Sequence, residues 1–267
     1  MKEQMNIVGI IPARMASSRF PGKPLAEIQG IPMVGHVYFR SRMCRIMNEV
    51  YVATCDREIA DYVNSIGGKF VITADTHQRA SERAAEAMIK IEQLAGKKID
   101  IVVMIQGDEP LIYPEMIEES LGPMLKDDSV KVVNLMAKMA TTEEFEDMNE
   151  VKVVVDKFNN ALYFSREPIP FRKKGVSDYP MLKQVPIIPF RREFLLEYIK
   201  MAPTPLEIIE SIDMLRIIEN GLKVKMVLTK YNTKSVDTKK DMERVDSMMA
   251  NDKLFENYQK LSKLNET

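Results

Sequence analysis

Apolar segments of two kinds alternate along the first 105 residues of the chain. Short, partly β-branched runs predict buried strands, and apolar residues at three- and four-residue spacing predict helices. These patterns place strands at residues 7–11, 49–54, 69–73 and 100–105, and helices at 32–47, 57–66 and 79–94. Strands that alternate with helices form a mostly parallel sheet covered by helices on both faces. The pattern therefore predicts an α/β fold.

The second half of the chain has a less regular pattern. We expect strands at 130–139, 151–156 and 223–228, one amphipathic helix at 205–220, and a last helix that begins at Asp237 or Thr238. The sequence contains no repeat, low-complexity tract or linker. The simplest organisation is a single domain over residues 1–267. It would consist of a first half at about 1–125, a smaller subregion at about 126–230, and a C-terminal helical segment at 231–267 that returns to the core.

A polar loop follows the first predicted strand. The stretch "IIPARMASSRFPGKPL", Ile10–Leu25, contains two arginines, one lysine, two serines, one glycine and three prolines. Such a loop can aim several backbone N–H groups at one point, and Arg14, Arg19 and Lys23 add positive charge. It is therefore suited to the phosphates of a nucleotide, although it matches neither the P-loop pattern nor G-x-G-x-x-G. The alternative is a solvated basic loop without a ligand.

Candidate polar residues also follow the strand at 100–105. In "MIQGDEPLI", Met104–Ile112, Asp108 is placed to bind Mg²⁺ together with phosphate oxygens, and Glu109 is a weaker candidate. Asp237 could supply a second carboxylate. The alternative is that Asp108 caps a turn and Asp237 caps the last helix. The amide of Gln106 can both donate and accept a hydrogen bond, which suits a base edge or a sugar hydroxyl.

Composition narrows the classes of function. The 267 residues carry 38 basic and 39 acidic side chains, a formal net charge of −1, which gives no overall attraction to nucleic acid or anionic membranes. No apolar run is long enough for a signal-peptide core or a membrane span. Cys44 and Cys55 fit no disulfide framework or zinc site. We therefore expect a soluble cytoplasmic protein whose partners are small molecules.

Seven segments, in order, resemble one enzyme family. They are "IIPARMASSRFPGKPLAEIQGIPMVGHV", "VYVATCD", "IQGDEPLI", "NEVKVVVDKFNNALYFSREPIPF", "FRREFL", "PLEIIESIDMLRIIENG" and "SVDT". The match runs from about Ile7 to Asp241, nearly the whole chain. In order and spacing, these segments are similar to those of the 3-deoxy-manno-octulosonate cytidylyltransferase family, also called CMP-KDO synthetases.

The resemblance implies a Rossmann-like nucleotidyltransferase fold and a homodimer. It also implies a reaction in which CTP and an acidic sugar give the CMP-sugar and pyrophosphate, with Mg²⁺ required, in lipopolysaccharide biosynthesis. The sugar hydroxyl would attack the α-phosphorus of CTP in line, which depends on positioning and charge neutralisation rather than on a nucleophilic side chain. The first half of the chain would bind CTP, and the subregion at about 126–230 would provide the acceptor site and the dimer interface.

The family's site residues are carried over by position. For catalysis the resemblance indicates Arg14, Lys23, Asp108 and Asp237, the two aspartates as Mg²⁺ ligands. Nucleotide contacts would come from Pro12, Ala13, Arg14, Ser17, Ser18, Arg19, Gly22, Lys23, Arg79, Ser81 and Gln106. Acceptor contacts would come from Arg83, Gln106, Arg166, Gln184, Ile188 and Asp213. Arg166, in "YFSREPIPF", can bind a carboxylate with two parallel hydrogen bonds.

Two segments depart from the family pattern. The family has His-Pro-Ser-Gly-Thr-Asp-Arg where this chain has "HQRASER", His77–Arg83. In "QVPIIPF", Gln184, Pro186 and Ile188 replace a histidine, a glycine and a tyrosine that face the sugar, and Asp213 replaces a glutamate. The departures fall mainly on the acceptor side, whereas the phosphate and metal motifs are intact.

The identity of the acceptor therefore stays open at this stage. It is 3-deoxy-manno-octulosonate, or a different acidic acceptor such as an aminated octulosonate, another 2-keto sugar acid or a phosphonate. A nucleotide-binding regulatory protein without turnover is a further alternative. The presence of Lys23, Asp108 and Asp237 counts against it.

Overall fold

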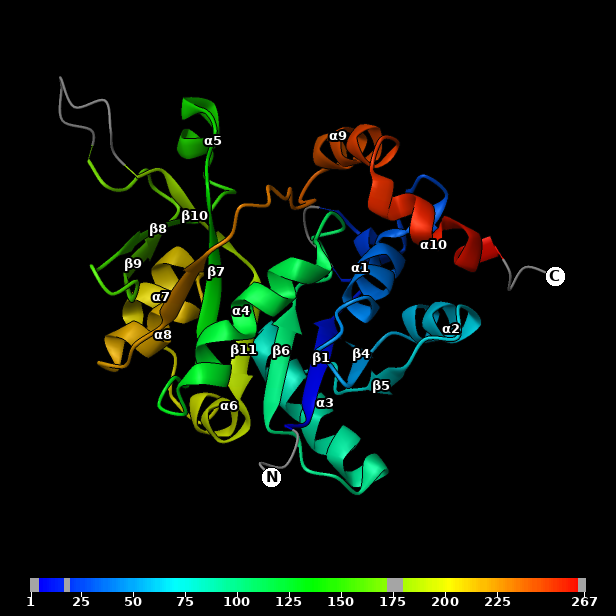
Figure 1. The fold of residues 1–267 in the computed structure, drawn as a ribbon, viewed down its shortest axis with the longest axis horizontal. Helices are drawn as coiled ribbons and strands as arrows, with labels where there is room; N and C mark the ends of the chain where they lie inside the picture. Colours follow the sequence, from blue (N-terminus) through cyan, green and yellow to red (C-terminus); the bar gives the residue numbers. More distant parts are fainter. Residues whose placement is uncertain (1–4, 17–19, 172–179, 264–267) are drawn as a thin grey trace. The chain divides into compact units, whose positions relative to one another are not determined.

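The computed structural model describes residues 5–16, 20–171 and 180–263. The chain divides into two compact units, of which unit 1 comprises residues 1–118 and 233–267 and unit 2 comprises residues 119–232 (Figure 1). Unit 2 is thus inserted into the sequence of unit 1, in the part of the chain where the sequence predicts the subregion. The roles expected of that subregion, in acceptor binding and dimer formation, stay predictions.

Four parallel strands form the centre of unit 1 and lie in the order β6–β1–β4–β5. Their bounds are β1 (Ile7–Pro12), β4 (Glu49–Thr54), β5 (Phe70–Ile72) and β6 (Ile101–Ile105). All five residues of β6 and the first five of β1 are buried, as their apolar sequences predict. After β1, the chain adds β4 and then β5 on one side of β1, and it then adds β6 on the other side of β1. The order of the strands therefore reverses between β1 and β6, which is where ligands bind in open parallel sheets.

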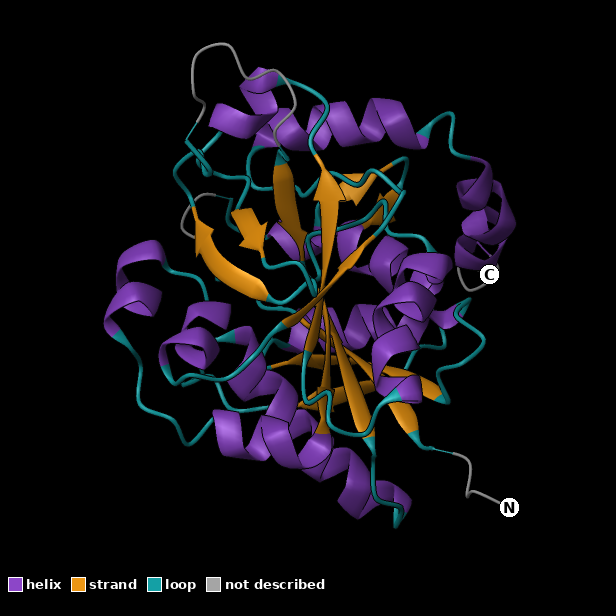
Figure 2. Ribbon diagram, turned by 60° about the vertical axis from the view of Figure 1, so that its left-hand side comes forward, coloured by secondary structure: helices purple, strands orange, loops and turns teal. Residues whose placement is uncertain are grey.

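Helices cover this sheet, as predicted. They are α1 (Met33–Arg42), α2 (Arg57–Ser65) and α3 (Ala80–Ala95). The helices α9 (Lys239–Met249) and α10 (Lys253–Lys263) are the C-terminal helices of unit 1, and α4 (Pro114–Lys126) follows β6. Helix α3 contacts all four strands, and in Figure 2 the strands (orange) have helices (purple) packed around them. Three short elements follow β1: η1 (Lys23–Leu25), β2 (Glu27–Ile28) and β3 (Ile31–Pro32). The prediction of a mostly parallel α/β fold is confirmed.

Two sequence-based expectations concern membranes and thiols. No helix among the described residues is long and apolar enough to cross a membrane. Cys44 is buried, Cys55 is half-buried, and both thiols are free.

The C-terminal helices of unit 1 lie beside α1 (Figure 1), and buried polar side chains hold them there. The fully buried Arg40 pairs with Asp252 at 2.6 Å and donates to Tyr258 Oη at 3.0 Å and to the Ile112 carbonyl at 3.2 Å. His36 Nδ1 lies 2.7 Å from the same Tyr258 hydroxyl. Burial lowers the pKa of His36 to about 4, so this histidine is neutral at pH 7. The segment that carries Asp237 is thereby fixed on its C-terminal side.

Unit 2 contains a mixed sheet in the order β12–β7–β10–β8–β9. Strand β7 pairs in parallel with β12 and antiparallel with β10, and β8 is antiparallel to both β10 and β9. The bounds are β7 (Val133–Lys138), β8 (Lys152–Val155), β9 (Ala161–Ser165), β10 (Leu182–Val185), β11 (Ile187–Arg191) and β12 (Lys225–Leu228), with helices α5 (Thr142–Glu146), α6 (Arg192–Tyr198), α7 (Pro205–Glu210) and α8 (Met214–Glu219).

The prediction of one continuous helix at residues 205–220 is wrong. Residues 205–220 form two short helices, because Ser211 adopts a left-handed conformation with φ of 55° and ends α7. Arg216 on α8 binds both carboxylate oxygens of the buried Glu207 on α7 at 2.6 Å. This bidentate pair holds the two helices together, and apolar periodicity cannot reveal it.

Candidate active site

The loop after β1 is fixed by backbone hydrogen bonds to neighbouring segments of unit 1. The N–H of Ala13 donates to the Ala53 carbonyl at 2.9 Å, and the N–H of Met15 donates to Asp56 Oδ2 at 2.7 Å. Gly22 has a φ of 74°, a conformation that favours glycine, and its N–H donates to the Met15 carbonyl at 3.1 Å. Sequence reasoning identified the loop but not the part played by Asp56.

The loop after β6 passes close to the end of β1. A Cβ atom added to Gly107 would lie 3.1 Å from the Pro12 carbonyl oxygen. Glycine at this position therefore lets the two loops approach at the point where the strand order reverses. Pro12 and Ala13, two of the expected nucleotide contacts, lie on one side of this approach, and Gln106 and Asp108 lie on the other.

Three segments remote in sequence meet at the ammonium group of Lys23. Lys23 Nζ donates to Asp108 Oδ2 at 2.8 Å and to the Val236 carbonyl at 2.8 Å, and lies 3.6 Å from Asp237 Oδ1. The three charged side chains are 14% (Lys23), 25% (Asp108) and 14% (Asp237) exposed. We call these three residues the Lys23 cluster. It brings together three of the four residues expected to act in catalysis.

Further contacts fix the two aspartates. The N–H of Val236 donates to the Asp108 carbonyl at 2.9 Å, which ties residues 233–237 to the β6 loop. The Thr233 hydroxyl donates to Glu109 Oε2 at 2.6 Å. Glu109 is only 5% exposed and holds this segment, so the structure does not favour it as a metal ligand. The N-cap of α9 is Thr238, so Asp237 precedes the cap and is not the cap itself.

The two carboxylates form a suitable donor set for a divalent cation. No group of three or more histidine, cysteine, aspartate or glutamate side chains gathers in the part of the chain that the structure describes. Mg²⁺ is commonly held by only one or two carboxylates, with water and phosphate oxygens completing its shell. The ammonium of Lys23 lies beside both Asp108 and Asp237, which shows that the pair attracts positive charge.

The remaining nucleotide candidates of unit 1 lie in different surroundings. Arg14 is exposed on the loop, Gln106 is half-buried after β6, and Arg79 is the N-cap of α3. Ser81 is fully buried in the first turn of α3. The expected contacts Ser17, Ser18 and Arg19 lie outside the described residues.

Arg83, an expected acceptor contact, is buried beside β5. Its Nη1 donates to the Thr73 hydroxyl and to the Ala74 carbonyl at 3.1 Å. The neighbouring His77 pairs with Glu86. Although burial acts to raise it, hydrogen bonds from Lys90, Ala74 and His77 lower the pKa of Glu86 to about 2. The altered segment at 77–83 is therefore a well-connected part of unit 1.

Arg166, the expected partner of the acceptor carboxylate, lies in unit 2 just after β9. Its Nε donates to the Glu210 carbonyl at 2.9 Å and its Nη1 donates to the Met148 carbonyl at 3.0 Å. Its backbone N–H donates to Glu210 Oε2 at 2.8 Å. Its Nη2 makes no hydrogen bond to any described residue.

Two residues that sequence reasoning missed position Arg166. Lys152 on β8 is fully buried, and its ammonium donates to the carbonyls of Asp147, Glu150 and Arg166 at 2.7, 2.8 and 2.5 Å. Burial lowers the pKa of Lys152, which the nearby carboxylates oppose. Glu210 holds Arg166 from the other side, as described above. The only sequence signal was a lysine inside the apolar run of "EVKVVVD".

The other acceptor candidates of unit 2 are partly engaged within the protein. Gln184 Nε2 donates to Asn134 Oδ1 at 2.5 Å, Ile188 is 2% exposed, and the Asp213 carbonyl accepts the Tyr198 hydroxyl at 3.0 Å. The contacts of these three residues with an acceptor stay predictions.

A parallel sheet whose strand order reverses at a basic loop, with two carboxylates beside it, suits the phosphates of a nucleotide, and the comparisons show that the chain is a nucleotidyltransferase. The chain belongs to the cytidylyltransferase family, whose family model matches residues 8–253. It is 43% identical over 251 residues to a 3-deoxy-manno-octulosonate cytidylyltransferase of Geobacter metallireducens, covering 90% of this chain and 96% of the relative. A second 3-deoxy-manno-octulosonate cytidylyltransferase, from Geobacter sulfurreducens, is 42% identical, covering 90% of this chain and 98% of the relative.

A solved structure supports the same assignment. It is a CMP:2-keto-3-deoxy-manno-octonic acid synthetase complexed with CTP, with a TM-score of 0.83 and 36% identity, covering 92% of this chain and 98% of that one. The resemblance seen in the sequence motifs is therefore confirmed, as is the assignment of the chain to an enzyme family.

Proposed function

We propose that this protein transfers CMP from CTP to 3-deoxy-manno-octulosonate and releases pyrophosphate, as a step in lipopolysaccharide biosynthesis. The observation that carries the proposal is the Lys23 cluster, which joins the phosphate-loop lysine to two carboxylates where the strand order reverses. The names of the relatives support the substrates.

In this reaction the chain's own residues act mainly by positioning and by neutralising charge. Lys23 and Arg14 would offset the charge that grows on the leaving pyrophosphate. Asp108 and Asp237 would hold Mg²⁺, which when bound would supply positive charge to the phosphate oxygens and favour deprotonation of the attacking hydroxyl. Arg166, fixed by Lys152 and Glu210, would bind the acceptor carboxylate through its Nη2 group.

A second acceptor class remains a candidate because of the residues at 184–188. Gln184 Nε2 donates to Asn134, and Ile188 is buried and apolar, so Ile188 supplies no hydrogen bond where the family has a tyrosine. Another 2-keto sugar acid or a phosphonate with fewer hydroxyl groups would need fewer hydrogen bonds from these positions, and an aminated octulosonate would replace one hydroxyl by an ammonium group.

Pyrophosphate release from CTP tests both proposals. Rates would be measured with 3-deoxy-manno-octulosonate, its 8-amino analogue, other keto sugar acids and phosphonates, each with and without Mg²⁺. The main proposal expects octulosonate to have the highest kcat/KM, by about tenfold, or about 1.4 kcal/mol in transition-state free energy. A higher kcat/KM for another acid would favour the second acceptor class. No release with any acceptor would refute both.

We also propose a homodimer located in the cytoplasm, where CTP is available. The dimer is supported by two adjacent exposed apolar side chains on α7, Ile208 and Ile209, which are 63% and 76% exposed. Sedimentation velocity at micromolar concentration would show a dimer that Ile209→Glu weakens. A monomeric wild-type protein would refute this part of the proposal.

A further inference from the structure

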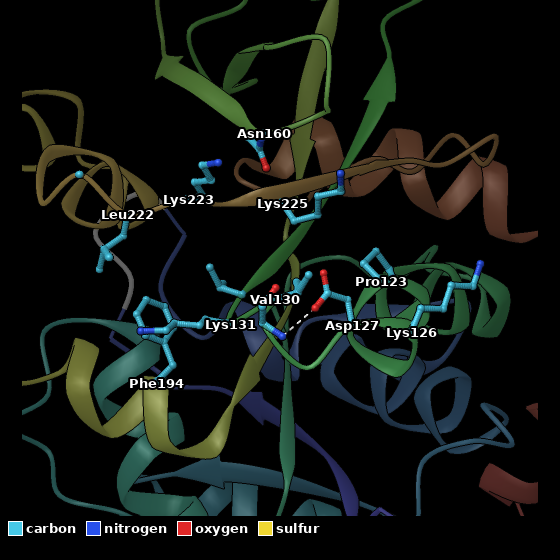
Figure 3. A pocket seen from close by; sticks show the side chains of 13 residues that line it. Pro123, Lys126, Asp127, Val130, Lys131, Asn160, Phe194, Leu222, Lys223 and Lys225 are labelled. Carbon is cyan, nitrogen blue, oxygen red and sulfur yellow. Dashed lines mark hydrogen bonds between the residues drawn. The ribbon is translucent and has the colours of Figure 1, made fainter.

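A cavity of about 550 Å³ lies within unit 2, at the edge of its sheet (Figure 3). Its walls come from the end of α4, the approach to β7, α6, and the segment that leads into β12. Every residue that lines it belongs to unit 2, whereas the Lys23 cluster belongs to unit 1. The cavity therefore includes no residue of the Lys23 cluster.

Four lysines line this cavity, and one acidic residue lies among them. Figure 3 shows Lys223 and Lys225 on one wall and Lys126, Lys131 and Asp127 on the other. We call this cavity, with its four lysines, the lysine pocket. The carboxylate of Asp127 accepts the backbone N–H of Ser129 at 2.8 Å, and hydrogen bonds from Ser129 lower the pKa of Asp127. The lining thus carries a clear excess of positive charge.

Two of the lysines have no strong partner of their own. Lys126 and Lys223 are exposed and make no hydrogen bond or ion pair to any described residue; Lys223 acts only at longer range on Asp156. Lys131 Nζ lies 5.4 Å from the centre of the Phe194 ring and 3.8 Å from Glu197. Lys225 Nζ donates to the carbonyl of Phe158. An anion would therefore meet two ammonium groups, those of Lys126 and Lys223, that protein carboxylates do not neutralise.

We propose that the lysine pocket binds a small phosphate-bearing anion at a site that none of the proposed catalytic or acceptor residues lines. A cavity of this volume falls in the range of roughly 300–1,000 Å³ typical of small-ligand sites. Lysine ammonium groups bind phosphate as point charges, and lysines stand on both walls of the cavity. Because the lysines are largely exposed, salt screens the interaction and the affinity is modest.

Amide chemical-shift titration tests the proposal on the full-length protein. Inorganic phosphate, CMP and glucose 6-phosphate would be added separately at constant ionic strength. CMP and glucose 6-phosphate distinguish a nucleotide from a sugar phosphate, and phosphate alone reports the shared group. We expect saturable shifts at residues 126–132 and 221–225 with at least one probe. The double variant Lys126→Gln/Lys223→Gln should weaken that binding about fivefold.

A matched variant provides the control. Lys138→Gln/Lys200→Gln removes two exposed lysines of unit 2 that do not line the cavity, and should leave the affinity unchanged. Both double variants should keep wild-type turnover of CTP, so failure of this proposal is distinct from failure of the proposed reaction. Shifts that do not saturate, or that weaken equally in both double variants, would show only general ionic attraction and would overturn the proposal.

Discussion

The buried pair between Arg40 and Asp252 gives the sharpest prediction of stability. Arg40 is fully buried, and the side chain of Asp252 is 7% exposed, with 2.6 Å between Nη2 and Oδ2. Asp252 has a second role, because its Oδ1 accepts the N–H of Leu254 at 2.8 Å in the first turn of α10. The substitution Asp252→Ala would remove both the counter-charge of Arg40 and this helix cap.

The expected loss follows from these two roles. Removing one partner of a buried ion pair costs about 3–5 kcal/mol, and the lower end applies because Arg40 keeps Tyr258 and the Ile112 carbonyl as acceptors. Loss of the cap adds about 1 kcal/mol. We therefore expect Asp252→Ala to lower the free energy of unfolding by about 4 kcal/mol. Asp252→Asn keeps an acceptor and the cap, and should cost only about 1.5 kcal/mol.

Urea unfolding monitored by circular dichroism measures both losses, and Asp61→Ala is the control. Asp61 also pairs with an arginine of unit 1, Arg57, but at 3.7 Å with side chains 68% and 90% exposed. Such a pair contributes about 0.5 kcal/mol. If Asp252→Ala cost no more than Asp61→Ala, the reasoning on the buried pair would be refuted. If Asp252→Ala does not fold, Asp252→Asn still decides the question.

Three further predictions concern the active site and pH. Asp108→Asn and Asp237→Asn should each abolish turnover at saturating Mg²⁺ without unfolding the protein; near-wild-type rates in either variant would exclude the metal-ligand role of that residue. Lys23→Ala should lower kcat far more than it weakens CTP binding, and a rise in KM alone would contradict this. His36 has a folded pKa of about 4 against 6.5 when unfolded, so the unfolded state gains its proton first as pH falls. The free energy of unfolding should therefore drop by about 3 kcal/mol between pH 6.5 and 4, and the drop should be smaller in His36→Gln.

Much of unit 1 could be predicted from local patterns, because buried parallel strands have a clear signature. The strand expected at 49–54 coincides with β4, and β1, β5 and β6 lie within one residue of their predicted bounds at each end. Helix α1 ends at Arg42 rather than at residue 47, because Met43 and Cys44 donate to the carbonyls of Arg40 and Ser41 in a tight turn. Apolar residues beyond this turn keep the three- and four-residue spacing of a helix, although the helix has already ended.

Unit 2 was harder to predict because its elements are short and contain prolines. Proline usually ends a helix or a strand, but helix α4 continues through Pro123. Pro186 separates two strands, β10 and β11, that follow each other directly. The break at Ser211 depends on a left-handed residue that is not glycine. Local sequence rules do not anticipate these cases.

The residues of the Lys23 cluster were identified from the sequence, but their contact was not. Lys23 is 85 residues from Asp108 and 213 from Val236, so only the strand order brings them together. Lys152 was missed for a different reason. Patterns of apolar and polar residues treat lysine as exposed, whereas here three carbonyl groups satisfy a buried ammonium.

The insertion of unit 2 into unit 1 has a consequence for the order of synthesis. Lys23 and Asp108 leave the ribosome early, and the whole of residues 119–232 follows before Asp237 emerges. While the chain is growing, Lys23 can pair with Asp108 but cannot meet Asp237. A nascent chain therefore holds the whole of unit 2 before it holds both Asp108 and Asp237, so the Lys23 cluster can form only after unit 2 has been synthesised.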